Sequence, residues 1–558
     1  MSCAWSQQYT ISTYAGSLTA GFAGDGGAPS SAQFSSPLGL TLDSSGDLYI
    51  VDSVNQRVRK ISGGAINTVA GDGTSGYSGD KAAATSAELL GPSAVAVDSS
   101  GNVYIADTGN HVIRMVSTSG TITTIAGNNT GGYTGDGGAA VDAELEFPTG
   151  VAVDAGGNVY IADSGNNAIR EVSGGNINTI VGSSTGQVLN DPVSVLVDSF
   201  GNLYISEQNG YRVSRFSNGA LTVLAGNGNI GSSGDNGPGV DAELDEPTGI
   251  ALDANGYLYI CDTANNKIRK ISPSGIITTI AGLGQNGYYG DGGPATGALL
   301  SLPRGIVVDP SGNVYVSDTQ NNLIRLLKPV APAITSAGAV NAASFTPQLS
   351  PGALASLFGS NFTGAGLTAS AALPLPSSLG GVAVQVNGVA APVLYSSTGQ
   401  INFQIPWETK PGAATLLVST NSVKSNQVNI NVQATAPGLF VSGSHAIVQN
   451  YPGYSLNSSS NPAKAGGTII AYLTGAGAVS NQPADGEPAG SDSVVTPTPT
   501  ASIGGQPATV SFAGLAPGFV GLWQVNIVVP AGVTAGDLPL TVTAGGETSK
   551  AANVSVTP

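Results

Sequence analysis

Five copies of the pattern D-x-x-N-x-x-[VI]-R each place an aspartate, an asparagine and an arginine close together in the chain. Aspartate and asparagine favour tight turns, and a guanidinium can bind a carboxylate through two parallel hydrogen bonds. Because a catalytic group is needed once rather than five times, we predict a structural turn network in each copy. The copies are Asp52 with Asn55 and Arg59, Asp107 with Asn110 and Arg114, Asp163 with Asn166 and Arg170, Asp262 with Asn265 and Arg269, and Asp318 with Asn321 and Arg325.

A second set of carboxylates lies in glycine-rich stretches such as "GGYTGDGG" (131–138). Their oxygens could hold a cation such as Ca²⁺. However, no helix start with a lysine follows, as in a phosphate loop, and the ligand spacing of an EF-hand is missing. We therefore expect a connection in which the aspartate binds local backbone, with cation or ligand contact as the alternative. These residues are Asp25, Asp80, Asp136, Asp235 and Asp291.

Both patterns belong to a unit that occurs six times and opens at a proline. Each unit has four short apolar runs separated by Asp/Gly turns, without helical periodicity. The sixth unit lacks its fourth run, and a matching run, "ISTYAG" (11–16), precedes the first unit. We therefore predict an all-β fold with a six-bladed β-propeller over residues 9–329, whose last blade is closed by the N-terminal strand. The opening prolines are Pro37, Pro92, Pro148, Pro192, Pro247 and Pro303.

The fourth unit departs from the pattern in two places. Its turn reads "EQNGYRVS", with Glu207 and Ser214 where the other units have aspartate and arginine, and the connection before it is short and lacks "GDGG". Both departures fall on the same face of a four-stranded blade. We therefore expect an open groove there, flanked by Asp163, Glu207 and Tyr211, with simple drift of one degenerate blade as the alternative.

The repeat region holds 14 Lys and Arg against 29 Asp and Glu, so it carries most of the net charge of −17. Many of these acids lie in or beside the long connections, and we expect one strongly negative face that attracts cations or basic partners. Such a surface is unsuited to nucleic acid, whose phosphates need positive charge. No apolar run of 18 residues occurs, so no membrane-spanning helix is expected, and no export signal is visible at the start.

The chain from residue 330 onward is rich in Val, Thr, Ser, Gly and Pro and alternates apolar with polar residues, as strands of β-sandwiches do. Within it, residues 378–406 parallel residues 501–530. We therefore predict two immunoglobulin-like β-sandwich domains, at 330–434 and 435–558.

Each copy contains a glutamine and an asparagine separated by one apolar residue, with a tryptophan nearby. We expect the two amides to point to opposite faces of a strand and to bind a neighbouring turn. Carbohydrate contact, with Trp407 and Trp523 as platforms, is the alternative. The amide pairs are Gln400 with Asn402 and Gln524 with Asn526.

The repeated unit, for example "PSAVAVDSSGNVYIADTGNHVIRMVS" from Pro92, resembles the NHL repeat, a family of six-bladed β-propellers. The resemblance implies a binding platform for proteins or, in some members, RNA; the RNA-binding members use basic surfaces, which this chain lacks. A few relatives are enzymes, and the peptide-amidating lyases hold zinc with several histidines. This chain has two histidines, His111 and His445, so a zinc site of that type is not expected, and His111 is interpreted as a solvated turn residue.

The tail resembles a C-terminal module of large exported proteins of Acidobacteria, through stretches such as "VNAASF" (340–345), "GQINFQIPW" (399–407) and "APGFVGLWQVNIVVP" (516–530). The stretch "PGALASLFGSNF" (351–362) is also similar to the start of an IPT/TIG immunoglobulin-like domain. This resemblance implies a bacterial, secreted protein, placed outside the cell, on its surface or in the periplasm.

No metal-binding His/Cys spacing, G-x-S-x-G elbow or Cys–His pair occurs. We therefore expect a non-enzymatic, monomeric binding or scaffold protein whose acidic propeller face takes a protein, peptide or carbohydrate ligand. The alternative is a metal-assisted hydrolase or lyase with a divalent cation at the propeller channel. That alternative requires carboxylate and amide ligands from different blades to line the channel.

Overall fold

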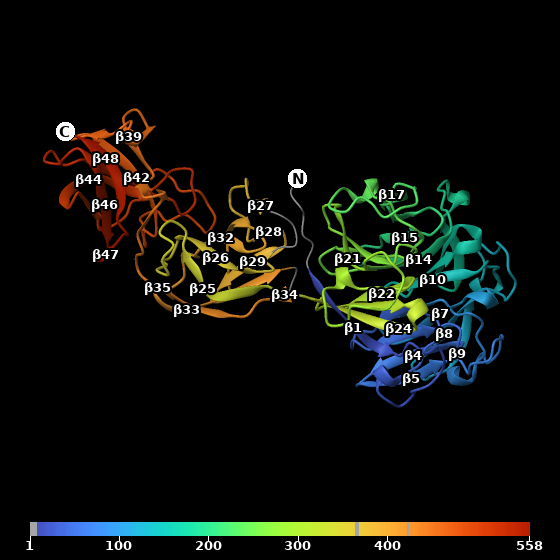
Figure 1. Ribbon diagram of the computed structural model, residues 1–558. Helices are drawn as coiled ribbons and strands as arrows, with labels where there is room; N and C mark the ends of the chain where they lie inside the picture. Colours follow the sequence, from blue (N-terminus) through green and yellow to red (C-terminus); the bar gives the residue numbers. More distant parts are fainter. Residues whose placement is uncertain (1–7, 363–367, 421–422) are drawn as a thin grey trace. The chain divides into compact units, whose positions relative to one another are not determined.

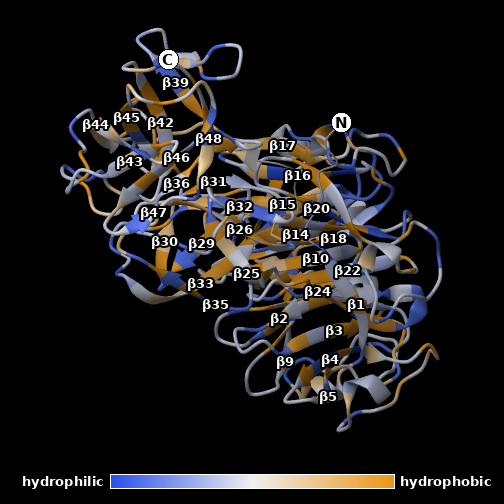
Figure 2. Ribbon diagram, turned by 60° about the vertical axis from the view of Figure 1, so that its left-hand side comes forward, coloured by the Kyte–Doolittle hydropathy of each residue, from blue (hydrophilic) through white to orange (hydrophobic). Residues whose placement is uncertain are grey.

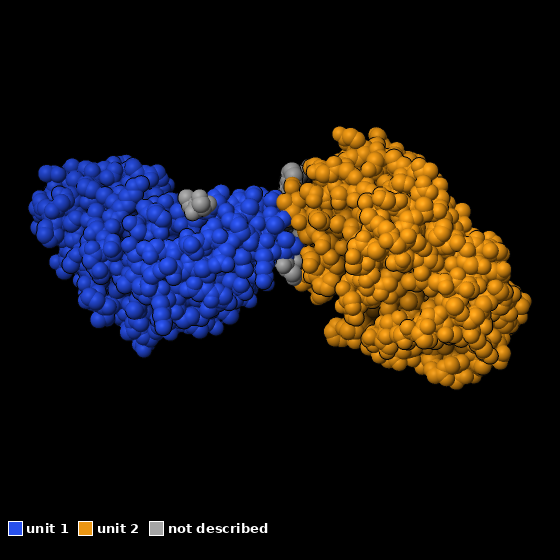
Figure 3. Space-filling model, turned by 90° about the horizontal axis from the view of Figure 1, so that it is seen from below, with its two compact units in different colours: residues 1–7, 331–558 blue, residues 8–330 orange. Residues whose placement is uncertain are grey.

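The computed structural model describes residues 8–362, 368–420 and 423–558, and these residues form an all-β structure (Figure 1). The chain divides into two compact units (Figure 3), Gln8–Val330 and, from Ala331 onward, the rest of the chain. In both units the strands are predominantly apolar and many connections are polar (Figure 2), as expected for sheets that bury one or both faces. No helix in the described part of the chain is long and apolar enough to cross a membrane.

The first unit contains six antiparallel sheets of four strands among the described residues. Five sheets each take their strands from one repeat. They are β2 (Pro37–Leu42), β3 (Leu48–Asp52), β4 (Arg57–Ser62) and β5 (Ala65–Ala70); β6 (Ala94–Val97), β7 (Val103–Asp107), β8 (Val112–Val116) and β9 (Ile122–Ala126); β10 (Pro148–Val153), β11 (Val159–Asp163), β12 (Ala168–Ser173) and β13 (Asn176–Val181); β14 (Pro192–Val197), β15 (Leu203–Glu207), β16 (Arg212–Ser217) and β17 (Ala220–Ala225); and β18 (Pro247–Leu252), β19 (Leu258–Asp262), β20 (Lys267–Ile271) and β21 (Ile277–Ala281).

The sixth sheet combines both ends of the unit. Its strands are β22 (Pro303–Val308), β23 (Val314–Asp318), β24 (Leu323–Pro329) and the N-terminal β1 (Tyr9–Gly16), which pairs with β24 from Tyr9 opposite Pro329 to Gly16 opposite Leu323. Asp291 accepts hydrogen bonds from the backbone N–H of Thr13 at 2.9 Å and from its hydroxyl at 2.7 Å. Thr68 on β5 binds Asp25 in the same way. Strand β1 therefore occupies the place that a fourth strand has in the other sheets.

Local turns set the length of each strand. Asp43 follows β2 and accepts the backbone N–H groups of Ser45 and Asp47, both at 3.0 Å, while Gly46 adopts φ +83°. A second turn joins the second and third strands and ends in a left-handed residue, such as Asn167 with φ +52°. Asparagine and glycine tolerate this conformation with little strain, so the turn is encoded locally. Short 3-10 helices such as η4 (Ala140–Asp142) lie in the connections.

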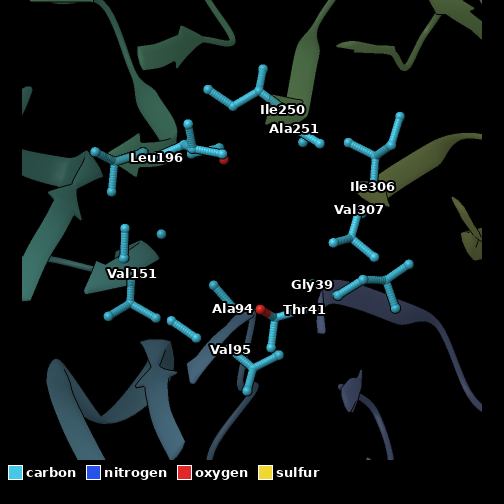
Figure 4. Close-up of a pocket in the computed structure, with 18 of the residues that line it drawn as sticks. Gly39, Thr41, Ala94, Val95, Val151, Leu196, Ile250, Ala251, Ile306 and Val307 are labelled. Atoms are coloured by element: carbon cyan, nitrogen blue, oxygen red, sulfur yellow. The ribbon is translucent and has the colours of Figure 1, made fainter. Parts of the chain in front are cut away.

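The first strands of the six sheets lie side by side around a central channel (Figure 4). Small residues allow this close approach. A Cβ atom on Gly305 would collide with the carbonyl of Leu38, and one on Gly249 with the carbonyl of Arg304. The hydroxyl of Thr319 donates to the carbonyl of Pro37 at 2.8 Å, which joins the sixth sheet to the first.

The second unit contains two successive strand-rich segments with separate cores. In the first segment, two sheets enclose a core that includes Leu357, Val384 and Phe403. One sheet comprises β25 (Ala333–Asn341), β26 (Leu354–Ser360), β27 (Thr368–Ala369), β31 (Val393–Ser396) and β32 (Gln400–Gln404). The other comprises β28 (Ser378–Leu379), β29 (Val382–Val386), β30 (Val389–Ala391), β33 (Gly412–Thr420), β34 (Val423–Lys424) and β35 (Val428–Val432).

The second segment differs from a sandwich of two separate sheets, because its described strands join into one 13-stranded sheet around a core that includes Trp523. Strand β44 pairs with β43 from Gln506 to Ala508 and with β45 from Thr509 to Leu515, with a register shift between Val510 and Phe512, and so links the two halves of the sheet. The strands are β36 (Gly438–Leu439), β37 (Val441–Ser442), β38 (His445–Ala446), β39 (Val448–Tyr451), β40 (Ser455–Leu456), β41 (Ala463–Lys464), β42 (Thr468–Thr474), β43 (Thr500–Ile503), β44 (Gln506–Leu515), β45 (Trp523–Val528), β46 (Gly536–Ala544), β47 (Glu547–Thr548) and β48 (Ala552–Thr557).

Candidate functional site

The aspartate, asparagine and arginine of the repeated pattern meet in the interior of five sheets. In the sheet β10–β13, the fully buried Asp163 accepts hydrogen bonds from Arg170 Nη1 at 3.1 Å, from Asn166 Nδ2 at 2.9 Å and from the backbone N–H of Glu146 at 2.7 Å. These side chains therefore hold the turn between the second and third strands.

The other four copies bring the same three side chains together. The asparagine amide donates to the aspartate at 2.8–2.9 Å in every copy. The arginine Nη1 lies 3.0–3.6 Å from that aspartate, and all four guanidinium groups are fully buried. The asparagines are Asn55, Asn110, Asn265 and Asn321, and the arginines are Arg59, Arg114, Arg269 and Arg325.

Burial dominates the electrostatics of these aspartates. It raises the pKa of Asp52 and of Asp107 to about 6, although hydrogen bonds and the facing arginine favour the charged form. Burial likewise raises the pKa values of Asp163, Asp262 and Asp318. The guanidinium in each network thus mainly offsets the cost of removing a carboxylate from water, and a variant that removes it leaves an uncompensated buried charge.

The "GDGG" aspartates supply a second carboxylate to the same arginines. Arg170 Nη2 lies 2.8 Å from Asp136 Oδ1. The pairs in the other sheets span 2.5–2.9 Å, namely Asp25 with Arg59, Asp80 with Arg114, Asp235 with Arg269 and Asp291 with Arg325. The five aspartates therefore lie one per sheet, each bound by an arginine, and are not brought together as a ligand set.

Aromatic rings of the long connections cover four of these guanidinium groups. The distance from the guanidinium carbon to the ring centre is 5.0–5.2 Å in each case, which allows a cation–π contact. The rings are Phe22 for Arg59, Tyr77 for Arg114, Tyr133 for Arg170 and Tyr288 for Arg325.

The described residues include no group of three or more His, Cys, Asp or Glu side chains placed to hold a metal ion. His111, which the sequence places in a solvated turn, has a structural contact instead. Its Nδ1 accepts the backbone N–H of Phe147 at 3.1 Å, and the two rings lie 4.6 Å apart. Through this contact the imidazole bridges two adjacent sheets.

In the fourth sheet, β14–β17, the turn carboxylate is bound by a different arginine of the same strand than in the other five sheets. Ser214 stands at the usual arginine position, and Arg212, two residues earlier and on the same face, binds Glu207 through Nε and Nη2, both at 2.8 Å. Ser214 also donates to Glu207 at 2.8 Å. Two residues expected to flank an open groove, Asp163 and Glu207, are thus fully buried and bound by arginines, because each completes a turn network.

Tyr211, the third residue of the expected groove, is half-buried and has φ +51°. In other sheets the side chain at this position accepts a backbone N–H of the next sheet, as Asn167 does from Asp191 at 2.7 Å. For Tyr211, the residue at the matching place in the next sheet is Glu246. Here Gln208 connects the two sheets instead, because its side-chain amide donates to Glu246 Oε2 at 3.3 Å. The fourth sheet therefore differs from the others where it faces the fifth.

Three acidic side chains lie near one another where the fourth sheet faces the fifth. Asp191, Asp245 and Glu246, hereafter the acidic rim, have no ion pair within 4.0 Å among the described residues. Partial burial raises the pKa of Asp191 and of Asp245, and the nearby charge of Glu246 raises both further. The carboxylate of Asp191 accepts a hydrogen bond from Asn209 Nδ2 at 3.0 Å. Repulsion among these carboxylates would be relieved by a cationic partner.

The central channel is a cavity of about 450 Å³ whose walls are mainly Val, Leu, Ile, Ala and Gly from the first strands (Figure 4). Among the described residues that line it, none is Asp, Glu, His or Cys. Arg304 and Gln208 are its longest polar side chains, and both lie near the ends of their strands where the turn networks lie.

Four hydroxyl groups connect adjacent sheets near the end of the channel where the turn networks lie, and the sequence predictions above do not include them. Thr108, Ser164, Thr263 and Thr319 each donate to the carbonyl of the proline that opens the next sheet, at 2.6–2.8 Å. Each directly follows the aspartate of the repeated pattern, so the dipeptide Asp-Thr or Asp-Ser was the available signal. Gln208 breaks this regularity in the fourth sheet.

The prediction that the two amides of each pair in the second unit point to opposite faces of a strand is wrong. Gln400 Nε2 donates to Asn402 Oδ1 at 2.8 Å, and Gln524 Nε2 donates to Asn526 Oδ1 at 2.9 Å. Residues i and i+2 share one face of a strand, so the two amides bind each other.

The two candidate carbohydrate platforms of the second unit are buried. Trp407 is 9 % exposed and packs with Ala489 and Leu515, whereas Trp523 is fully buried in the core. Neither ring therefore offers a free face on which a sugar could stack.

Comparison with known proteins agrees with the repeat pattern. A Teneurin NHL domain model matches residues 71–132, 130–199 and 196–289, and an NHL repeat model matches residues 34–61 and 300–325. The chain therefore contains NHL repeats in a propeller-like all-β fold, which confirms the resemblance of the repeat region.

Curated relatives match about half of this chain at low identity. Protein SUPPRESSOR OF QUENCHING 1, chloroplastic, of Arabidopsis thaliana is 30% identical over 307 residues, 53% of this chain and 25% of the relative. Teneurin-3 of Danio rerio is 27% identical over 289 residues, 48% of this chain and 9% of the relative. The chain thus spans a quarter or less of the length of these two relatives.

Similar solved structures include an auxiliary nutrient binding protein from Bacteroides ovatus, at 17% identity and a TM-score of 0.45 over 58% of this chain and 77% of that chain. A virginiamycin B lyase from Staphylococcus aureus gives 16% identity and a TM-score of 0.35 over 53% of this chain and 96% of that chain. Similarity at this level carries no argument about function.

Proposed function

We propose that this protein is a non-enzymatic binding or scaffold protein whose acidic rim takes a basic protein or peptide segment. The observation that carries the proposal is the group Asp191, Asp245 and Glu246, three neighbouring carboxylates without an ion-pair partner among the described residues. Partial burial makes their negative charges costly, so a lysine or arginine from a partner would gain more here than at a dispersed surface acid. Gln208 and Asn209, which bind Glu246 and Asp191, shortly precede Tyr211 in the chain, at the sector where a groove is expected from the sequence.

The state of the other polar groups supports binding rather than catalysis. The repeated aspartates and arginines are engaged with one another, and the described residues that line the channel include no Asp, Glu, His, Cys, Lys or Tyr that could act as a general acid or base. A metal-assisted hydrolase or lyase needs carboxylate or imidazole ligands at the channel, and the lining residues that the structure describes include none. A role for Ca²⁺ at Asp25, Asp80, Asp136, Asp235 or Asp291 would require it to displace an arginine from each carboxylate.

The proposed architecture places this rim on a rigid ring. We infer that residues 9–329 form a six-bladed propeller closed by β1, and that residues 330–434 and 435–558 are two related immunoglobulin-like modules. The pairing of β1 with β24 and the amide pair repeated in β32 and β45 support these inferences. We further propose that the protein acts as a secreted or surface-held bacterial monomer, in which the tail serves as a stalk or matrix contact.

Binding of a fluorescent lysine-rich peptide, followed by anisotropy, tests the function. We expect the double variant Asp191→Asn with Glu246→Gln to weaken binding at least fivefold, and salt to weaken binding to the unmodified protein. The matched control, Asp142→Asn with Glu144→Gln, removes the same charge from another connection and should leave the affinity within twofold. Equal losses in both double variants would show that only overall charge matters and would contradict a site at the rim.

A further inference from the structure

The channel has the size and walls of a small-molecule site. Its volume of about 450 Å³ falls within the range of roughly 300–1,000 Å³ that ligand pockets occupy. Val95, Val151, Leu196 and Ile250 are among the apolar residues that line it (Figure 4). An apolar ligand segment would gain by leaving water for these walls.

One residue of the channel lining has no architectural explanation. Arg304 is the single charged residue of the lining, and its guanidinium makes no hydrogen bond or ion pair within the part of the chain that the structure describes. The arginines of the turn networks, by contrast, all face carboxylates. The equivalent position after the opening proline holds an uncharged residue in the other five sheets, namely Leu38, Ser93, Thr149, Val193 or Thr248. The fold therefore does not require a cation here.

The surroundings of Arg304 restrict the ligand to a single negative charge. Gln208 lines the same channel and donates to Glu246, which brings the acidic rim close to this mouth. A dianion would be repelled by Glu246 and Asp191, whereas one carboxylate can pair with the guanidinium through two hydrogen bonds.

We propose that the channel binds an aliphatic monocarboxylate, with its carboxylate on Arg304 and its apolar tail between the first strands. This site is separate from the function proposed above and does not depend on it. The acidic rim takes a cation from outside the ring, whereas Arg304 takes an anion at the channel mouth.

Calorimetric titration with hexanoate, hexanol and hexylammonium, which share one tail, tests the proposal. We expect hexanoate to bind most tightly, and Arg304→Gln to weaken hexanoate at least tenfold without changing hexanol. The control Arg215→Gln removes an exposed arginine of the fourth sheet and should leave all three affinities unchanged. Ala94→Phe, which adds a ring at the channel wall, should weaken every ligand. Equal hexanoate affinity with and without the Arg304 guanidinium, or no binding at millimolar concentration, would overturn the proposal.

The rim variant separates the two proposals. Asp191→Asn with Glu246→Gln should weaken the lysine-rich peptide but strengthen hexanoate severalfold, because it removes negative charge beside the same mouth. If it weakened hexanoate, the carboxylate would not lie at this mouth and the proposal would fail. Unfolding midpoints of each variant, compared with the unmodified protein, confirm that a lost affinity is not a lost fold.

Discussion

The third sheet, β10–β13, and the fourth, β14–β17, each bind the buried carboxylate of the turn between their second and third strands with an arginine, but the arginine comes from a different strand position in each. In the third sheet, the fully buried Arg170 is held between Asp163 of the turn and Asp136 of the long connection. In the fourth, the connection is short and has no such aspartate, and the arginine at the corresponding strand position is absent as well. The loss of both together shows that the connection aspartate and the strand arginine form one unit. Arg212 then binds Glu207 from a side chain that is 31 % exposed.

Removal of the two arginines should have different costs, and this is the largest effect that we predict. Arg170→Met leaves Asp163 buried without a counterion, so we expect a loss of about 3–5 kcal/mol in the free energy of unfolding of the repeat unit. Arg212→Met should cost about 1–2 kcal/mol, because Arg212 is 31 % exposed, so water can fill the space that its guanidinium leaves beside the buried Glu207, and Ser214 still donates to Glu207. Urea unfolding followed by circular dichroism measures both.

The second unit supplies an internal control for this experiment. Trp407 and Trp523 lie in it, so in a Trp5→Phe background, which removes the third tryptophan, the fluorescence transition should be unchanged in both variants. Equal losses for Arg170→Met and Arg212→Met would contradict the view that the fourth sheet has a more solvent-exposed ion pair.

The turn networks could be predicted from the sequence because every partner lies within eight residues and recurs at fixed spacing. The position of β1 could also be predicted, since a matching fourth run precedes the first unit while the sixth unit lacks one. The link between Asp136 and Arg170 was missed, although the same spacing of 34 residues separates the partners in all five copies. Repeated spacing across a connection was the signal that could have revealed it.

Other features depend on three-dimensional closure and leave no local signal. The channel wall is assembled from first strands that belong to different repeats, so the isolation of Arg304 becomes visible only when the six strands are placed together. The acidic rim likewise joins Asp191 to Glu246 across two sheets. By contrast, the replacement of the usual arginine by Arg212 and the amide pair Gln400 and Asn402 could have been predicted locally, because residues i and i+2 share one face of a strand.

The arginine of the third sheet should be harmful when placed in the fourth. Ser214→Arg adds a second guanidinium beside Glu207, and the short connection provides no aspartate to receive it. We therefore expect a loss of about 2–3 kcal/mol in the stability of the repeat unit, measured by the same urea unfolding. The double variant Ser214→Arg with Arg212→Ser returns one arginine to Glu207 and should recover part of that loss. If Ser214→Arg were neutral, the connection aspartate would not be needed to accept this arginine.

The smallest predicted effect concerns the acidic rim and depends on pH. Burial and the charge of Glu246 raise the pKa of Asp191 in the folded protein above its value in the unfolded chain. Between these two values the folded state binds more protons, so the contribution of Asp191 to stability falls as pH rises and stays low at neutral pH. Asp191→Asn removes this penalty and keeps an acceptor for Asn209, so it should raise the free energy of unfolding at pH 7 by about 0.5 kcal/mol, with screening by solvent included.

The gain from Asp191→Asn should disappear near pH 3, where the aspartate is protonated in both states. Asp142→Asn, at an exposed acid in the connection before the third sheet, provides the matched comparison and should change stability little at either pH. Glu246→Gln should reproduce part of the gain at pH 7, because it removes one of the causes that raise the pKa of Asp191. A loss of stability at pH 7 in Asp191→Asn would mean that the carboxylate is favourable where it lies, and that the fourth sheet carries no electrostatic cost that a basic partner could relieve.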